Sequence, residues 1–149
     1  MLGGAKRQIG KSISELSQDT RFAVIFGAQK ITRKFPENGR PIEATPGNKK
    51  GASRFLEYVP VDGEAPARED LLAALRSAES LNVARKTIIY IGTCSIAAAD
   101  QKKILDEITS KNTQRVQINT FGIAPYQETE DFLRKLAAMN GGTFKRLEL

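Results

Sequence analysis

The sequence predicts an α/β fold with three layers, in which a mostly parallel sheet carries helices on both of its faces. Three observations predict this class. Helical and strand-like patterns alternate along the chain, which is the order that parallel sheets require. The strand-like runs at 21–28 and 87–92 are almost wholly apolar, as expected of strands buried on both faces. The 149 residues contain no internal repeat or long linker, so we expect a single domain over residues 1–149.

The first part of the chain is predicted to hold two helices and two strands. Apolar residues recur at helical spacing in residues 3–18, which indicates an amphipathic helix. The buried strand at 21–28 follows, and the cations of residues 30–35, KITRKF, suit an antiparallel edge strand with one solvated side. The next helix, at 46–59, is marked by Thr45 as its N-cap and by Pro46 as its first residue.

The remainder alternates regularly between helix and strand. Apolar residues at helical spacing predict helices at 68–81, 97–111 and 128–140. Strands are expected at 87–92, 115–123 and 143–149, the last at the sheet edge. The run NGG at 140–142 predicts that the last helix ends in a left-handed cap.

The composition excludes several kinds of chemistry. The chain contains no histidine, which removes Ser–His and Cys–His catalysis as well as histidine metal ligands. We therefore expect neither an enzyme nor a bound cofactor. No run of about 18 apolar residues could cross a bilayer, and the first residues lack the apolar core of a signal peptide. For the chain as given, this predicts a cytoplasmic location without membrane insertion.

The net charge is +6, and the excess of positive charge lies in residues 1–60. A basic surface of this kind attracts nucleic acid and other polyanions. The candidate residues for such a surface are Lys30, Arg33, Lys34, Arg40, Lys49, Lys50 and Arg54. The nearby aromatic residues, Phe35 and Phe55, fit core positions rather than a platform for stacking bases. Polyanion binding is therefore an alternative hypothesis, and a solvated basic face is the simpler interpretation.

The strand at 87–92 runs directly into a Gly-Thr-Cys-Ser turn. Open α/β sheets bind their ligands at the carboxyl ends of strands, so Thr93, Cys94 and Ser95 are candidate interaction residues. Tyr126, in the loop after the following strand, is another candidate contact. A cysteine near a helix start can be reactive, but no histidine is present to activate Cys94. We interpret Cys94 as a small buried residue.

Several segments occur in an order and spacing that resemble a von Willebrand factor A domain. These segments are TRFAVIFGAQ, EATPGNKKGASRFLEYV, LLAALRSAESL, TIIYIGT and INTFGIAPYQETEDFLRKLAAMNGGTFKRL. The similarity covers nearly the whole chain and is greatest to the bacterial versions with an Ala-Thr-Pro loop. It implies a Rossmann-like fold whose loops bind another protein.

The resemblance also implies a degenerate metal site. In metal-binding members, an Asp-x-Ser-x-Ser motif, a threonine and the Asp of Thr-Asp-Gly hold Mg²⁺ or Mn²⁺. Here Cys94 stands at that last position, and a neutral thiol is a poor ligand for Mg²⁺. The loop VDGEAPARED contains no threonine, and Asp-x-Ser-x-Ser occurs nowhere. We therefore expect protein binding without a metal ion.

A second alternative function depends on a bound divalent cation. The loop at 62–70 offers carboxylate oxygens from Asp62, Glu64, Glu69 and Asp70. The function would be metal-dependent (Mg²⁺ or Mn²⁺) adhesion if these oxygens rebuilt a cation site, or if the sequence is a fragment of a longer domain.

The resemblance implies that the first strand of that family is missing here. The chain opens with MLGGAKRQIG, which resembles the stretch that follows this strand. In the family the strand runs up the centre of the sheet, between the strands expected here at 21–28 and 87–92. Three solutions remain open: the two strands pair directly, another chain donates a strand or forms a homo-oligomer through the gap, or the sequence is an N-terminally truncated fragment. A fragment would come from a secreted or membrane-anchored protein.

Overall fold

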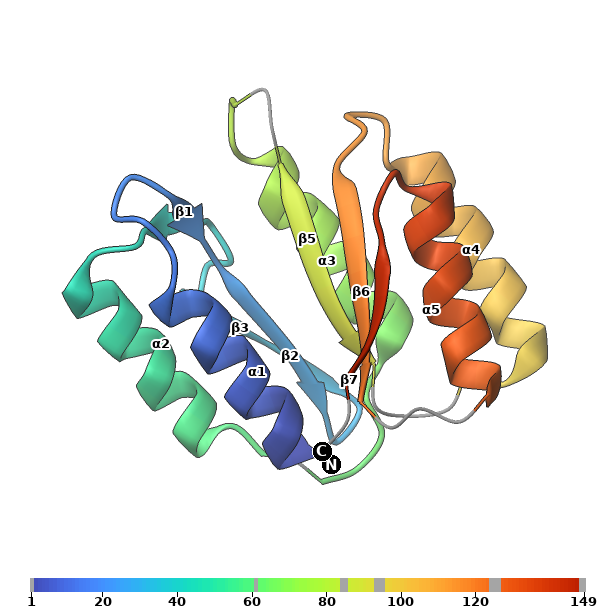
Figure 1. Ribbon diagram of the computed structural model, residues 1–149, viewed down its shortest axis with the longest axis horizontal. Helices are drawn as coiled ribbons and strands as arrows, with labels where there is room; N and C mark the ends of the chain where they lie inside the picture. Colours follow the sequence, from blue (N-terminus) through green and yellow to red (C-terminus); the bar gives the residue numbers. More distant parts are fainter. Residues whose placement is uncertain (1, 61, 84–85, 93–95, 124–126, 148–149) are drawn as a thin grey trace.

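The computed structural model describes residues 2–60, 62–83, 86–92, 96–123 and 127–147 (Figure 1). Helices and strands alternate over most of this length, which confirms the predicted α/β class. The elements are α1 (Leu2–Ser14), β1 (Arg21–Phe22), β2 (Val24–Ala28), β3 (Ile31–Phe35), β4 (Ile42–Glu43), α2 (Pro46–Tyr58), α3 (Ala67–Glu79), β5 (Thr87–Gly92), α4 (Ala98–Lys111), β6 (Gln117–Ile123), α5 (Gln127–Met139) and β7 (Phe144–Leu147). None of the helices in these ranges combines the length and apolar character of a membrane span.

The strands form three separately hydrogen-bonded groups. β5, β6 and β7 make a parallel sheet with β6 in the middle, β2 and β3 form an antiparallel hairpin, and β1 pairs with β4. The predicted parallel sheet and antiparallel edge strand are thus confirmed. In the described part of the chain, no ladder of hydrogen bonds joins β2 to β5. The two strands therefore do not pair directly, and the sheet is interrupted between them.

Helices pack on both sides of the strand layer (Figure 1). α1 and α2 bury Phe22, Val24 and Phe26 of the β1–β2 segment. α3, α4 and α5 cover the face of the parallel sheet that carries Ile88 and Ile118. α3 contacts both β2 and β5, so this helix connects the two halves of the molecule across the interruption.

Two helix ends follow from local chemistry, as the sequence predicts. Thr45 accepts a hydrogen bond at Oγ1 from the N–H of Asn48, at 3.2 Å, and caps α2 at its first turn. Gly141 has a φ of +69° just after α5, and the N–H of Gly142 donates to the carbonyl of Ala137 at 2.9 Å. This is the left-handed cap expected from the NGG run.

Two expectations for the first strands are wrong in detail. The strand expected at 21–28 is divided at Ala23, and its first part pairs with β4, which is too short to be recognised from its pattern. Lys30 lies in the turn and not in the edge strand, because Gln29 and Lys30 both adopt positive φ and place Ala28 opposite Ile31. A two-residue turn with this backbone matches the twist of a hairpin.

The first helix is also shorter than expected, because it ends at Ser14 rather than near residue 18. The segment that follows makes turns instead. In one of them the N–H of Thr20 donates to the carbonyl of Ser17 at 3.0 Å.

The turn at the end of β2 is held by a distant loop. The N–H of Gln29 donates to the carbonyl of Asp62 at 3.1 Å, and that of Lys30 donates to the carbonyl of Glu64 at 2.7 Å. Between these acceptors, Gly63 has a φ of +76°, and a Cβ at this position would lie 2.9 Å from the Cα of Gln29. Only glycine fits this position without strain.

Replacing Gly63 by alanine should therefore destabilise the fold. We expect Gly63→Ala to lower the free energy of unfolding by roughly 2 kcal/mol or more, since it adds backbone strain and a contact with main-chain atoms. The matched control is Gly10→Ala in α1, where a Cβ would meet no atom within 4 Å; this change should stabilise by about 0.5–1 kcal/mol. Urea unfolding measures both, and equal effects of the two substitutions would contradict the role assigned to Gly63.

Candidate functional site

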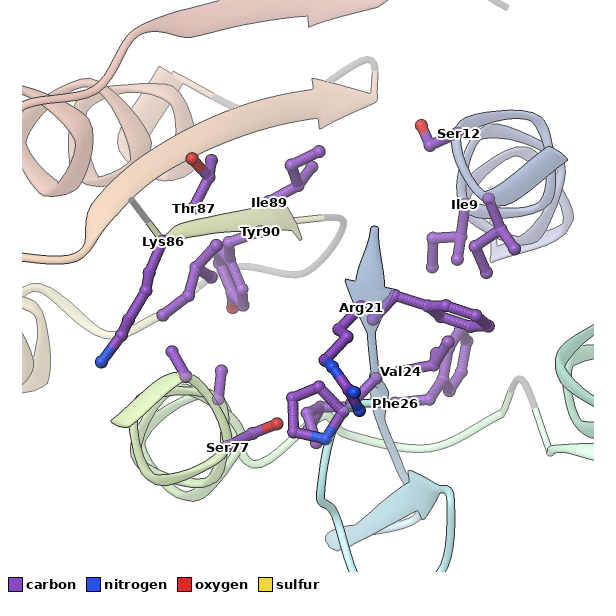
Figure 2. Close-up of a pocket in the computed structure, with 18 of the residues that line it drawn as sticks. Ile9, Ser12, Arg21, Val24, Phe26, Ser77, Lys86, Thr87, Ile89 and Tyr90 are labelled. Atoms are coloured by element: carbon purple, nitrogen blue, oxygen red, sulfur yellow. The ribbon is translucent and has the colours of Figure 1, made fainter. Parts of the chain in front are cut away.

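A groove lies where the sheet is interrupted, between β2 and β5 (Figure 2). Its volume is about 700 Å³, and its walls come from α1, β2, α3 and β5. The volume falls within the range of typical ligand pockets, which is about 300–1,000 Å³. We refer to this cavity as the groove.

The two helical walls of the groove differ in the size of their side chains. On α1 the wall is formed mainly by the large apolar residues Ile9, Ile13 and Leu16. On α3 it includes the small residues Ala74, Ser77 and Ala78. These positions of the α3 wall therefore carry shorter side chains than the α1 wall.

The side chains of β5 alternate between the two walls. Figure 2 shows Ile89 and Tyr90 on opposite sides of the strand, with Tyr90 toward α3. Ile88 is buried in the main core, whereas Ile89 is 51% exposed. The sequence predicts a strand buried on both faces, and the structure corrects this. The face of β5 that carries Ile89 is left partly uncovered.

The backbone edge of β5 that faces the groove is unpaired. The N–H of Gln117 donates to the carbonyl of Lys86 at 3.1 Å, so Lys86 and every second residue after it turn their peptide groups toward β6. The peptide groups of Thr87, Ile89 and Ile91 consequently face the groove. In the described ranges, no hydrogen bond joins them to another segment.

The edge of β2 that faces the groove is unpaired as well. Ala28 and Ile31 flank the two-residue turn and are therefore a hydrogen-bonded pair of the hairpin. By alternation, Ile25 and Gly27 turn their peptide groups away from β3 and into the groove. Within the part of the chain that the structure describes, these groups are likewise unpaired. The groove thus lies between two strand edges that present free donors and acceptors.

Asp70 is a buried carboxyl group on the α3 wall. Its relative exposure is 8%, and it accepts a hydrogen bond from the hydroxyl of Thr32 at 2.6 Å. Burial raises the pKa of Asp70 to about 6, although the bond from Thr32 acts in the opposite direction. The carboxyl group lies against the backbone of β2, since a Cβ on Gly27 would be 1.8 Å from Oδ2.

The acidic residues of the 62–70 loop take separate partners. Asp62 accepts from the amide of Gln29 at 2.9 Å, and Glu69 pairs with Arg68 at 3.3 Å. Glu64 is exposed, and Asp70 lies in the groove. Among the described residues, no three His, Cys, Asp or Glu side chains are close enough together to hold a metal ion. The loop residues are thus not gathered around a common point.

The strand-end candidates lie outside the described residues: Thr93, Cys94, Ser95 and Tyr126. The strands that lead to them end at the same edge of the sheet, because Gly92 of β5 is opposite Gly122 of β6. The described ends of the two strands therefore lie side by side, as expected for a parallel sheet.

The basic candidates are distributed over the β2–β3 turn, β3, the loop after it and α2, in the order Lys30, Arg33, Lys34, Arg40, Lys49, Lys50 and Arg54. Two of them act within the fold. Lys49 Nζ donates to the carbonyl of Leu16 at 2.6 Å, and Arg33 Nη1 donates to the carbonyl of Ala28 at 3.1 Å. The rings of Phe35 and Phe55 lie 6.1 Å apart and pack on the core under α2, as the sequence predicts.

Most residues of the groove could not be identified from the sequence. In the sequence, Ser77 and Ala74 are ordinary polar and small residues of a predicted helix. Asp70 is interpreted there as an acidic residue of the 62–70 loop or of the first turn of that helix. The apolar run at 87–92 was the one signal in the sequence that could have indicated the groove. Both faces of such a strand need apolar cover, and the helices that follow it cover only one face. Which face of that strand lacks cover depends on tertiary packing.

Comparisons with known proteins identify the fold. No protein-family model matches the sequence, and no curated protein matches it. Among solved structures, the chain is similar to a von Willebrand factor type A protein from Catenulispora acidiphila, with a TM-score of 0.80 and 21% sequence identity. The match covers 98% of this chain and 34% of that one, so this chain spans about a third of its length. The von Willebrand factor A-like fold implied by the sequence resemblance is confirmed.

The buried carboxyl group of Asp70 predicts a pH-dependent stability. Its folded-state pKa of about 6 lies above the ordinary value of 3.8. As the pH rises, the folded protein therefore keeps this proton up to a higher pH than the unfolded chain does. Stability from this group is therefore present below about pH 4 and is lost as the pH rises through about 6. Asp70→Asn cannot ionise and still accepts from Thr32. We expect its free energy of unfolding, relative to the unmodified chain, to be higher at pH 7 than at pH 4 by roughly 1–3 kcal/mol.

Urea unfolding at both pH values measures this difference. The control is Glu37→Gln, which makes the matching replacement of a carboxyl group by an amide at an exposed turn residue. An Asp70→Asn effect that is the same at both pH values would show that burial does not shift the titration of this group.

Proposed function

We propose that this chain is a protein-interaction module of the von Willebrand factor A type that works without a metal ion and without catalysis. The observation that carries the proposal is the groove: a largely apolar cavity in the middle of the strand layer of a von Willebrand factor A-like fold. A mostly apolar cavity of ligand-pocket volume is the first candidate for a binding site on a globular protein.

The chemistry of the groove favours binding over catalysis. Its walls are mostly aliphatic, and the buried ionisable group on the α3 wall is Asp70. General acid–base and nucleophilic mechanisms need a second group that activates or accepts a proton, and the sequence has no histidine for that role. Aliphatic walls instead favour apolar side chains, because their burial removes apolar surface from water.

The metal-independent part of the proposal rests on the acidic residues. In the resemblance, Cys94 occupies the position of an acidic ligand. The carboxylates of Asp62 and Glu69 are held by Gln29 and Arg68, so a cation would have to displace these partners. Metal-dependent adhesion through the 62–70 loop is the alternative, and it requires this rearrangement.

We also propose that the groove is the place of the central strand that the resemblance implies to be missing. It lies between β2 and β5, the strands that correspond to the family's neighbours of that strand. Their unpaired edges support this assignment.

Polyanion binding is the weaker proposal. Arg33 and Lys49, two of the seven candidate cations, are engaged as donors to backbone carbonyls. The adjacent rings of Phe35 and Phe55 are partly buried against the core, which leaves less of their faces for stacking with bases.

Divalent metal should leave the stability of the chain unchanged. Calorimetry of the metal-free protein, with and without millimolar Mg²⁺ or Mn²⁺, measures this, since a ligand that binds only the folded state raises the melting temperature. We expect the transitions to coincide, and the chelated sample serves as the reference. A rise of several degrees would favour metal-dependent adhesion instead.

Protein partners should depend on the groove. We compare proteins captured from a cell extract by the immobilised chain and by two variants with the same charge change, Ser77→Glu on the α3 wall and Ser53→Glu at an exposed position of α2. A carboxylate in the apolar groove carries a desolvation cost, so Ser77→Glu should lose partners that Ser53→Glu retains. Identical sets would contradict binding through the groove, and partners released by nuclease would favour polyanion binding.

A further inference from the structure

We propose that the groove is a strand acceptor: a partner protein inserts one extended, apolar segment between β2 and β5 and thereby joins the two parts of the sheet. This inference deepens the proposed function and rests on it. It specifies the chemistry of the partner, which is a β-strand of about six residues, and the manner of binding, which is pairing with both edges at once.

The backbone argues for a polypeptide rather than a small apolar molecule. Thr87, Ile89 and Ile91 present peptide groups from one side of the groove, and Ile25 and Gly27 present them from the other. A hydrocarbon ligand would cover these donors and acceptors without pairing them, which costs free energy. A strand satisfies both rows, because alternate residues of a strand direct their peptide groups to opposite edges.

The two edges agree in length and direction. β2 has 5 residues and β5 has 6, which matches a strand of ordinary length. Both strands run toward the same end of the molecule (Figure 1). An inserted strand is therefore parallel to both or antiparallel to both, and one strand direction serves the two edges.

The walls define the side chains of the segment. Successive side chains of a strand point to opposite faces, so they meet the α1 wall and the α3 wall in turn. Ile9 and Ile13 form an apolar surface on the first wall, while Ala74, Ser77 and Ala78 leave space on the second. The segment is therefore apolar on both faces, with its larger side chains toward α3. This is the pattern of a strand from the interior of a sheet, not of an amphipathic edge strand.

A partner of different sequence fits better than a second copy of this chain. In the described part of the structure, each strand is already paired within its own copy. A second copy would have to break one of these pairings to donate a strand. A flexible segment of another protein loses no existing pairing when it inserts.

The test is a selection followed by hydrogen exchange. A display library of peptides with six randomised positions between Gly-Ser flanks is selected against the full chain, with the Ser77→Glu and Ser53→Glu variants in parallel. We expect enriched sequences that are apolar at successive positions, bind the unmodified chain and Ser53→Glu, and bind Ser77→Glu at least about tenfold more weakly.

The enriched peptide is then synthesised in two forms, unmodified and with proline at its central positions. Proline keeps an apolar side chain but removes the backbone donor, so its affinity should fall at least about tenfold. Binding of the unmodified peptide should slow amide exchange at Ile25, Gly27, Thr87, Ile89 and Ile91. The amides of Lys34 and Phe144, on the outer edges of β3 and β7, are the internal controls and should keep their rates.

Each other outcome overturns the inference in a distinguishable way. Equal affinity of the two peptide forms would show that the groove takes apolar groups without strand pairing. A groove-dependent dimer of the chain alone, seen by ultracentrifugation and abolished by Ser77→Glu, would assign the groove to a second copy. No enrichment would refute strand acceptance; if Ser77→Glu still lost captured proteins, the proposed function would stand without it.

Discussion

This structure depends on one constraint: the peptide groups of its strands need hydrogen-bond partners. Among the residues that the structure describes, β2 and β5 each have one paired edge and one free edge, and the free edges face each other across an apolar groove. Free peptide groups are acceptable in contact with water but costly once they are covered. The groove therefore stays open unless its occupant also supplies donors and acceptors. The shape of the cavity and the class of molecule that suits it follow from this one requirement.

The two halves of the molecule are held together without a continuous sheet. α3 takes over part of that task, since it contacts both β2 and β5. The bond from Thr32 to Asp70 joins β3 to α3, and the contact of Asp70 with Gly27 joins the same helix to β2. A buried carboxyl group beside a glycine is thus part of the connection between the halves. Its raised pKa is the consequence of that position.

Much of the fold could be predicted from the sequence, and less of the candidate site. The caps at Thr45 and Gly141 and the strand at 87–92 were predictable, because each depends on residues near it in the sequence. The division of the first strand at Ala23 and its pairing with β4 were not, since a strand of two residues carries no periodic pattern. The sequence predicted the groove only as a gap between two strands, which the resemblance to von Willebrand factor A domains implies. It did not predict which residues line the groove.

The sequence by itself determined the α/β class, the order of the longer elements, the caps at Thr45 and Gly141 and the absence of histidine chemistry. These properties depend on local spacing, local capping and composition. Only the tertiary structure decided which edges of β2 and β5 stay unpaired, why Ile89 is exposed, and where the acidic residues of the 62–70 loop lie. The physical reason is that pairing and burial join residues far apart in the chain, such as Thr32 with Asp70, and no local pattern records such partners.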